Sequence, residues 1–248
     1  DVIGGFAWRD VRLPADDSHG PLNGCMLRCV YAEVSPAGTA MNRIPEFNRD
    51  LFTTVLRHLS VQRNEPLDQY DMVKLHVLTD FFHVLKEGEP VIGGHPAVWP
   101  HGPVVADAYE LALSWSTKGG EFHEVNRRGN TVMMAPVSQA DNWDEVIWPE
   151  AAEAVGEACD LHMPMSFEQS QAFFHSPESY FGEVWTTKKT RGWGTPIHWL
   201  DVVQAYERHT GRDAGHVKVL LNAPTNEQLM AIAARHPAPD AYWNGDIE

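Results

Sequence analysis

The sequence predicts an α+β fold that is mostly helical, with a compact helical core that carries a β-hairpin and with α/β extensions at both ends. Three patterns indicate this fold. Between Pro45 and Leu59, apolar residues recur every four positions, as on one face of a helix. The stretch between Asp68 and Gly88 is apolar on more than one face, which is typical of a helix at the centre of a core. The stretches Glu121–Val125 and Thr131–Ala135 flank the turn-rich stretch 126–130, as in a β-hairpin.

The first 44 residues are expected to be an extension that holds one strand. Residues 1–24 are rich in Gly, Pro, Asp and Asn, which favours irregular structure. A strand is predicted at Cys25–Val34, and the stretch 35–38, Ser-Pro-Ala-Gly, ends it. The N-terminus has neither the basic region nor the long apolar region of a signal peptide, so no secretion signal is expected.

The central helix has well-marked expected ends. Asp68 can cap its N-terminus, and Asp71 lies in the first turn, where a negative charge is favourable. Gly88 provides a C-terminal stop. Pro90 and Pro103 bracket the loop that follows and discourage the helix from continuing. A separate helix is therefore expected after this loop.

The rest of the chain is predicted to be mainly helical. Capping boxes precede two of the helices, at Ser166–Gln169 and Thr225–Gln228. A strand is predicted at His216–Leu221. The main domain is expected to span residues 45–193, followed by an extension at 194–248 that ends in an acidic tail. The other helices are expected at Val104–Trp115, at Pro149–Leu161, from Ser176 onward, and at Thr195–His209.

Charge and cysteine content narrow the possible functions. There are 19 Lys and Arg residues against 34 Asp and Glu, a net charge of −15, which repels phosphate backbones and argues against nucleic-acid binding. This charge suits a basic partner protein, although acidity can also serve solubility alone. The three cysteines, Cys25, Cys29 and Cys159, form no CxxC pair, which favours a reducing cytoplasm over a disulfide framework. No apolar run approaches the ~20 residues of a membrane helix, so no membrane partner is expected.

One segment carries the most specific pattern in the chain. Its helical part, 74–83, has the sequence Lys-Leu-His-Val-Leu-Thr-Asp-Phe-Phe-His. The range 87–91, Glu-Gly-Glu-Pro-Val, links it to 97–109, Ala-Val-Trp-Pro-His-Gly-Pro-Val-Val-Ala-Asp-Ala-Tyr. This layout resembles the signature of the Panacea domain, the family of SocA-like antitoxins, over roughly residues 45 to 193. Val77 departs from the family pattern, which commonly has Tyr at that position.

The resemblance implies a cytoplasmic antitoxin that neutralises a cognate protein toxin by direct binding, and not an enzyme. In some relatives a protease receives the toxin from the antitoxin, which then acts as an adaptor. Proteins of this kind are often carried on prophages, and we expect no cofactor. The candidate contact residues for the partner, taken from the motif alone, are Phe82, Trp99, His101, Pro103 and Tyr109.

The same segment has a physical explanation that does not depend on the family. Gly102 permits a turn that is closed to residues with a Cβ, and Pro103 is expected to open the next helix. Trp99 and Tyr109 are expected to hold the loop against the helix that begins after Asp68. This is a folding role first, and a rigid loop can also present a binding surface.

Two other functions stay open. One is a metal-dependent enzyme, because His76, Asp80 and His83 have the i, i+4, i+7 spacing of ligands on one helix face. His95 and His101 lie just downstream. Because 13 histidines make such spacing easy by chance, the alternative is that the three are partly exposed polar positions on a core helix. The other is a phage interaction or anti-defence protein that uses the same domain on a target that is not a toxin.

A basic and aromatic patch is predicted near the end of the main domain. The stretch 186–194, TTKKTRGWG, is expected to be a loop. It contains Lys188, Lys189 and Arg191, and the indole rings nearby in sequence are Trp185 and Trp193. The patch suits an acidic partner segment or a phosphate. A solvated loop over a small apolar cluster is the alternative.

Overall fold

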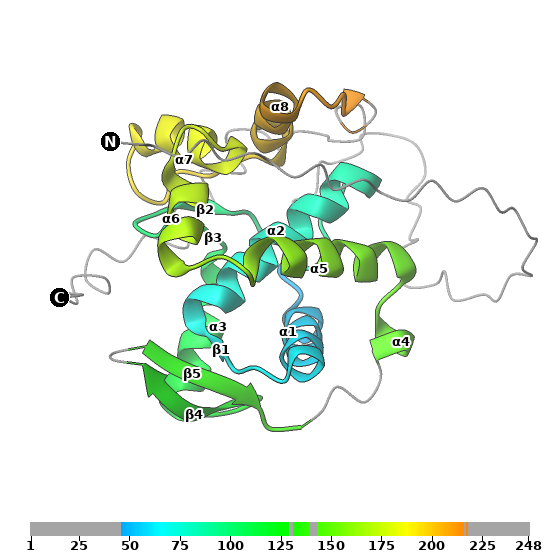
Figure 1. Ribbon diagram of the computed structural model, residues 1–248, viewed down its shortest axis with the longest axis vertical. Coiled ribbons are helices and arrows are strands. Elements are labelled where there is room, and N and C mark those ends of the chain that lie inside the picture. Colours follow the sequence, from blue (N-terminus) through cyan, green and yellow to red (C-terminus); the bar gives the residue numbers. More distant parts are fainter. Residues whose placement is uncertain (1–45, 129–130, 139–142, 216, 218–248) are drawn as a thin grey trace, which may run out of the picture. The chain divides into compact units, whose positions relative to one another are not determined.

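The computed structural model describes residues 46–128, 131–138, 143–215 and 217 (Figure 1). These residues belong to one compact unit of the chain, Met41–Glu248, and they form a mostly helical α+β fold, as predicted. The helices are α1 Arg49–Arg63, α2 Gln69–Glu87, α3 Ala106–Lys118, α4 Trp143–Val146, α5 Pro149–His162, α6 Phe167–His175, α7 Tyr180–Lys189 and α8 Trp199–Thr210. The strands are β1 Leu67–Asp68, β2 Ala97–Trp99, β3 Gly102–Val104, β4 Phe122–Arg128 and β5 Thr131–Pro136.

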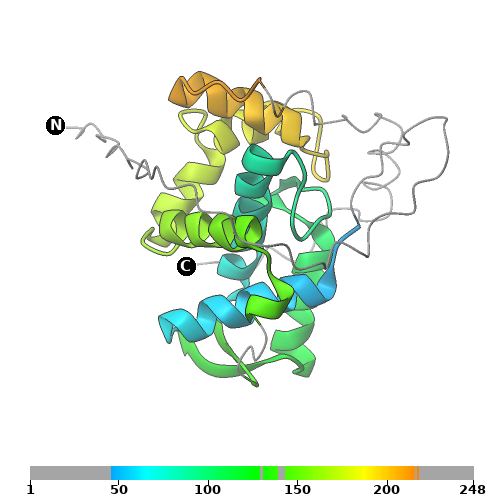
Figure 2. The ribbon, with the colours of Figure 1, turned by 90° about the vertical axis from the view of Figure 1, so that its right-hand side faces the viewer.

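Helix α2 lies at the centre, with α5 across it and with α8 and the β4–β5 hairpin at opposite ends (Figures 1 and 2). The Oδ1 atom of Asp68 accepts a hydrogen bond from the backbone N–H of Asp71 at 2.7 Å and so caps the helix. The helix ends at Gly88, whose φ of +78° favours glycine. Every residue from Met72 to Phe81 is buried, which confirms the predicted central helix.

Helix α1 packs against the centre through several buried side chains, and the largest of them is the ring of Phe52. The Asn48 side chain caps α1 by accepting a hydrogen bond from Leu51 N at 3.0 Å. The Phe52 ring lies between His76 of α2 and Trp115 of α3, with centroid distances of 5.3 Å and 5.9 Å. The helix begins later along the chain than predicted, because its cap is Asn48. It also ends later, at Arg63, where Asn64 adopts the left-handed conformation.

The predicted hairpin after α3 is confirmed. Strands β4 and β5 pair antiparallel, and a bulge between Glu124 and Asn126 shifts their register. The short strand β1 adds to β5, with Leu67 opposite Met134. This places the start of α2 directly beside the hairpin.

A second, smaller hairpin joins β2 and β3, and the sequence did not indicate it. Trp99 pairs with Gly102, and Val98 pairs with Pro103. Pro103 therefore lies in a strand, and the expectation that it opens a helix is wrong. Helix α3 begins only at Ala106, because residues 102–104 continue the pairing.

The stretch 194–197, just after the predicted domain boundary at residue 193, lies along β2. Val98 N donates to Thr195 O at 2.9 Å, Gly194 N donates to Val98 O at 2.8 Å, and Ile197 N donates to Pro96 O at 2.8 Å. Because this stretch is used in pairing, α8 begins at Trp199 and not at Thr195 as expected. The residues of this region that belong to the main core include Ile197, Trp199, Val202, Val203 and Ala205.

Helices α6 and α7 differ in how well the sequence predicted them. The capping box at Ser166 is present and opens α6. Helix α7 was expected from Ser176, but its cap is Ser179, which accepts a hydrogen bond from Gly182 N at 2.9 Å. The stretch expected to be a loop from Thr186 is helical as far as Lys189.

Some predicted elements lie outside the described residues. These are the strand Cys25–Val34, the helix from Thr225, and all of the strand His216–Leu221 except Val217. Val217 is helical, and its N–H donates to Ala214 O at 3.0 Å, so the strand does not include it. Within the described ranges, no helix is both long and apolar enough to cross a membrane.

Candidate functional site

Lys74 joins the two halves of the motif-bearing segment. Its side chain is fully buried, and its Nζ donates a hydrogen bond to the carbonyl oxygen of Pro103 at 2.9 Å. The same nitrogen lies 4.7 Å from the centroid of the Phe174 ring and 5.2 Å from that of Tyr70. Burial holds the pKa of Lys74 well below its usual value of 10.5. The amine therefore ties α2 to β3 from within the core.

Gly102 is required at the turn of the small hairpin for two reasons. Its φ is +97°, which residues with a side chain rarely adopt. A Cβ at this position would lie 2.9 Å from Phe174 Cβ and 3.0 Å from Lys74 Nζ. The turn is closed to other residues, as the sequence suggested, and the atoms that close it include the amine of the other motif half.

Trp99 and Tyr109 form a small second core under the hairpin. Their ring centroids are 4.9 Å apart, and the cluster includes Val73 of α2. The carbonyl oxygen of Trp99 accepts a hydrogen bond from Trp185 Nε1 of α7 at 2.9 Å. The expectation that these two rings hold the loop against α2 is confirmed.

The five predicted contact residues do not form one exposed surface. Trp99 is 3% exposed and Tyr109 5% exposed, and Pro103 is also buried. Buried side chains have no area to offer a partner, so as contact residues these three are corrected to a scaffold role. His101 and Phe82 are half-buried, and Phe82 packs beside Phe81 against the main core, a different cluster from Trp99.

Asp80, a proposed metal ligand, is buried and holds the backbone of the loop after α2. Its Oδ1 accepts a hydrogen bond from Ile92 N at 2.6 Å, and its Oδ2 accepts one from Gly93 N at 3.0 Å. His76 Nε2 lies 3.1 Å from Asp80 Oδ2 and 3.0 Å from Gly93 O. Both residues are buried, contrary to the expectation of partly exposed positions, and both are used to fix the chain.

His83, the third proposed ligand, also has other partners. Its Nδ1 lies 2.7 Å from Glu89 O, and Trp148 Nε1 donates to its Nε2 at 3.3 Å. In the part of the chain that the structure describes, no group of three His, Cys, Asp or Glu side chains is arranged to hold a metal ion. The helical spacing of His76, Asp80 and His83 is explained by these structural bonds.

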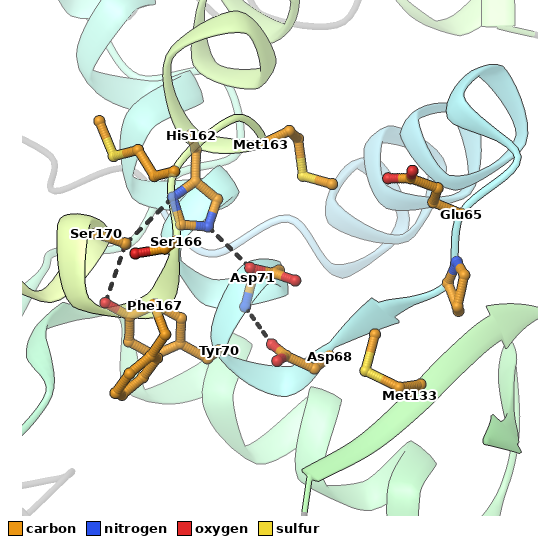
Figure 3. Close-up of a pocket in the computed structure, with 12 residues that line it drawn as sticks. Glu65, Asp68, Tyr70, Asp71, Met133, His162, Met163, Ser166, Phe167 and Ser170 are labelled. Carbon is orange, nitrogen blue, oxygen red and sulfur yellow. Dashed lines mark hydrogen bonds and ion pairs between the residues drawn. The ribbon is translucent and has the colours of Figure 1, made fainter. Parts of the chain in front are cut away.

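A pocket of about 380 Å³ opens beside the N-terminus of α2, where the end of α5, the start of α6 and β5 meet it (Figure 3). Glu65, Asp68 and Asp71 line it, and the carboxylates of Glu65 and Asp71 turn toward the space between them. Three methionine side chains also line it. They are Met133, Met163 and Met165.

A chain of side-chain hydrogen bonds connects the three helices around this pocket (Figure 3). Asp71 Oδ1 lies 3.0 Å from His162 Nε2, His162 Nδ1 lies 3.4 Å from Ser170 Oγ, and Ser170 Oγ lies 3.1 Å from the Tyr70 hydroxyl. Burial raises the pKa of Tyr70 to about 12, so its hydroxyl is neutral. The order of groups is that of an acid, base and nucleophile, but Ser170 is only 2% exposed inside α6. We infer that this series of hydrogen bonds holds α2, α5 and α6 together.

The basic and aromatic patch is built on α7 and the residues after it. Lys189 Nζ lies 4.5 Å from the centroid of Trp185 and 5.2 Å from that of Trp193, which is 44% exposed. Lys188 pairs with Asp201 of α8 at 2.6 Å. Lys188 is thus engaged in an ion pair within the protein. The amine of Lys189 lies close to two indole rings.

Two half-buried histidines border the small hairpin. The ring of His175 stacks on Trp185 at a centroid distance of 4.2 Å. Burial, with smaller contributions from Lys74, His101 and Lys189, lowers the pKa of His175 to about 4. Burial and Lys74 also lower the pKa of His101. Both rings are therefore neutral at pH 7.

Sequence reasoning missed the pocket. Its residues come from five separate elements and the loops beside them, and local patterns give each of them an ordinary role, such as Asp68 as a helix cap. The capping box at Ser166 was visible and fixes where α6 begins. It carries no information on which part of α2 lies opposite.

Comparison of the chain with known protein families, with curated proteins and with solved structures gives no match.

Proposed function

We propose that this protein is a cytoplasmic antitoxin of the Panacea type, which neutralises a cognate protein toxin by direct binding and not by catalysis. The observation that carries the proposal is the contact between Lys74 and Pro103, which joins the two halves of the segment that resembles the family. Gly102 fits against the same amine. The residues of the resemblance are thus the residues that build one rigid unit.

The charge of the chain supports a binding role with a basic partner. A net charge of −15 attracts a positively charged protein over a distance and raises the rate of encounter. A toxin that acts on RNA or DNA carries such a charge, because it has to bind phosphates. The acidic pocket beside α2 gives this attraction a local target.

The arrangement of the polar groups supports binding over catalysis. Among the described residues, the chain of Asp71, His162 and Ser170 is the arrangement nearest to that of a hydrolase, and its serine is covered. The histidines on α2 hold backbone and indole groups. These partners account for the side chains without a reaction.

A pull-down of the tagged protein from its native host tests the proposal. We expect one small basic protein, encoded beside this chain, to co-purify in near equal amount. Expression of that protein alone should stop growth, and co-expression with this chain should restore it. Toxicity that persists on co-expression would contradict the proposal. A partner that is not toxic by itself would favour the phage interaction or anti-defence protein.

A further inference from the structure

The charged lining of the pocket beside α2 is of one sign. Glu65, Asp68 and Asp71 contribute carboxylates, and no Lys or Arg is among the described residues that line it. His162 contacts Asp71 at 3.0 Å, and even a protonated His162 would leave an excess of negative charge. The pocket therefore favours a cation and repels phosphates and carboxylates.

The rest of the wall includes polar groups of α5 and α6 and several apolar, adaptable side chains. Met133, Met163 and Met165 line it with flexible thioethers, which fit irregular shapes. Phe167 is 44% exposed at the pocket, and its ring lies 5.2 Å from that of Tyr70. Exposed aromatic rings of this kind stack on planar cations. A fitting ligand has an apolar stem and a cationic end.

We propose that this pocket binds an arginine side chain of the partner protein. The stem lies along the methionines and Phe167, and the guanidinium lies among the carboxylates of Glu65, Asp68 and Asp71. The inference rests on the proposed function for the source of the arginine. A planar fork of five N–H donors on an apolar stem matches this combination better than any other natural side chain.

The size of the pocket is consistent with a single inserted side chain. Its volume of about 380 Å³ is near the lower end of the range for ligand pockets, roughly 300–1,000 Å³. Such a space accepts one long side chain with its adjoining backbone, and not a folded segment. An arginine at the centre of an interface is also among the residues that contribute most to affinity.

The charge can be removed without removing the fold. Asp68 caps α2, and asparagine is an equally good cap, so Asp68→Asn keeps the helix start. Glu65 is exposed, so Glu65→Gln disturbs little packing. The matched control is Glu87→Gln with Glu89→Gln, which removes the same charge from two exposed positions at the other end of α2.

The test is nuclear magnetic resonance of the full chain labelled with ¹³C-methyl methionine. The probe is N-acetyl-arginine methylamide, and its neutral isostere, N-acetyl-citrulline methylamide, is the comparison. We expect arginine to shift the methyl signals of Met133, Met163 and Met165 with a dissociation constant on the order of 1 mM. The citrulline probe, and the Glu65→Gln/Asp68→Asn variant, should bind roughly tenfold more weakly. The Glu87→Gln/Glu89→Gln control should bind as the wild type does.

Equal binding of arginine and citrulline, or no shift of these methionines, would overturn the proposal. Since the probe is not a toxin, this result is independent of the pull-down. If a partner is recovered from the host but the pocket does not bind arginine, this inference is wrong and the proposed function stands. Arginine binding without any protein partner would overturn the assignment of the side chain to a partner protein.

Discussion

Helix α2 has two regions with opposite character. Around Lys74 and Gly102, the buried amine donates to the carbonyl oxygen of Pro103 and no space is left for a methyl group. At the first turn, Asp68 and Asp71 face a pocket with an exposed Phe167 on its rim. The motif that resembles a known family lies in the closed region, and the surface suited to a partner lies in the open one. Substitutions should therefore unfold the first region and leave the second folded but unable to bind.

The largest expected effect is that of Gly102→Ala in the closed region. The added Cβ would lie 2.9 Å from Phe174 Cβ, on a backbone with φ of +97°. We expect the free energy of unfolding, measured by urea denaturation, to fall by about 3 kcal/mol or more, since strain and overpacking add.

Gly192→Ala is the matched control for that variant. Gly192 has φ of +111°, and a Cβ there would have no atom within 4 Å. Gly192→Ala should lower the free energy of unfolding by the backbone strain alone, about 1–2 kcal/mol. Equal losses for the two glycines would show that the contact with Lys74 and Phe174 is not tight.

A loss of similar size is expected when the carboxylate that holds the loop after α2 is removed. Asp80→Ala leaves the N–H groups of Ile92 and Gly93 buried without their acceptor, and should lower the free energy of unfolding by about 3 kcal/mol. Asp80→Asn keeps one acceptor oxygen and should cost less. A chelator should not change the melting temperature of the wild type. A fall in melting temperature on chelation would return His76, Asp80 and His83 to the metal-site hypothesis.

A smaller effect should appear as a pH dependence of the closed region. Burial, with smaller contributions from Lys74, His101 and Lys189, lowers the pKa of His175 from 6.5 to about 4 in the folded state. Between pH 6.5 and pH 4, His175 is protonated in the unfolded chain and neutral in the folded protein. The free energy of unfolding therefore decreases as the pH falls from 6.5 to 4. The loss is on the order of 1 kcal/mol after screening by solvent.

His175→Phe should flatten this part of the pH curve, because phenylalanine keeps the stacking on Trp185 and does not titrate. Denaturation at several pH values between 4 and 7 measures the difference. Parallel curves for the variant and the wild type would contradict the assignment.

The smallest change in stability is expected in the open region. Phe167 is 44% exposed, so Phe167→Ala should change the free energy of unfolding by less than about 1 kcal/mol. The same variant should recover clearly less partner in a pull-down, since the ring forms part of the proposed arginine site. Full recovery of the partner would exclude Phe167 from the interface.

The sequence predicted local features better than contacts between distant segments, for a physical reason. The caps Asp68, Gly88 and Ser166 act on their own neighbours, so local pattern was enough to find them. The burial of Trp99 and Tyr109 followed from their apolar rings. The path of residues 194–197 along β2 depends on contacts between segments far apart in the chain, and no local pattern encodes it.

The same limit applies to the candidate site. The pocket exists because Asp71 of α2 lies opposite His162 and Ser170, which come from α5 and α6. Each of these residues has an unremarkable local setting. The predicted contact residues were taken from the motif, and a motif formed by packing residues marks the scaffold and not the surface.

The central claim is that the closed region builds the fold and the open pocket binds the partner. The most direct test is a pull-down from the native host with three proteins side by side: the wild type, the Glu65→Gln/Asp68→Asn variant and the Glu87→Gln/Glu89→Gln control. The account predicts the same small basic protein with the wild type and the control, and its loss with the pocket variant. Equal recovery with all three proteins would contradict it.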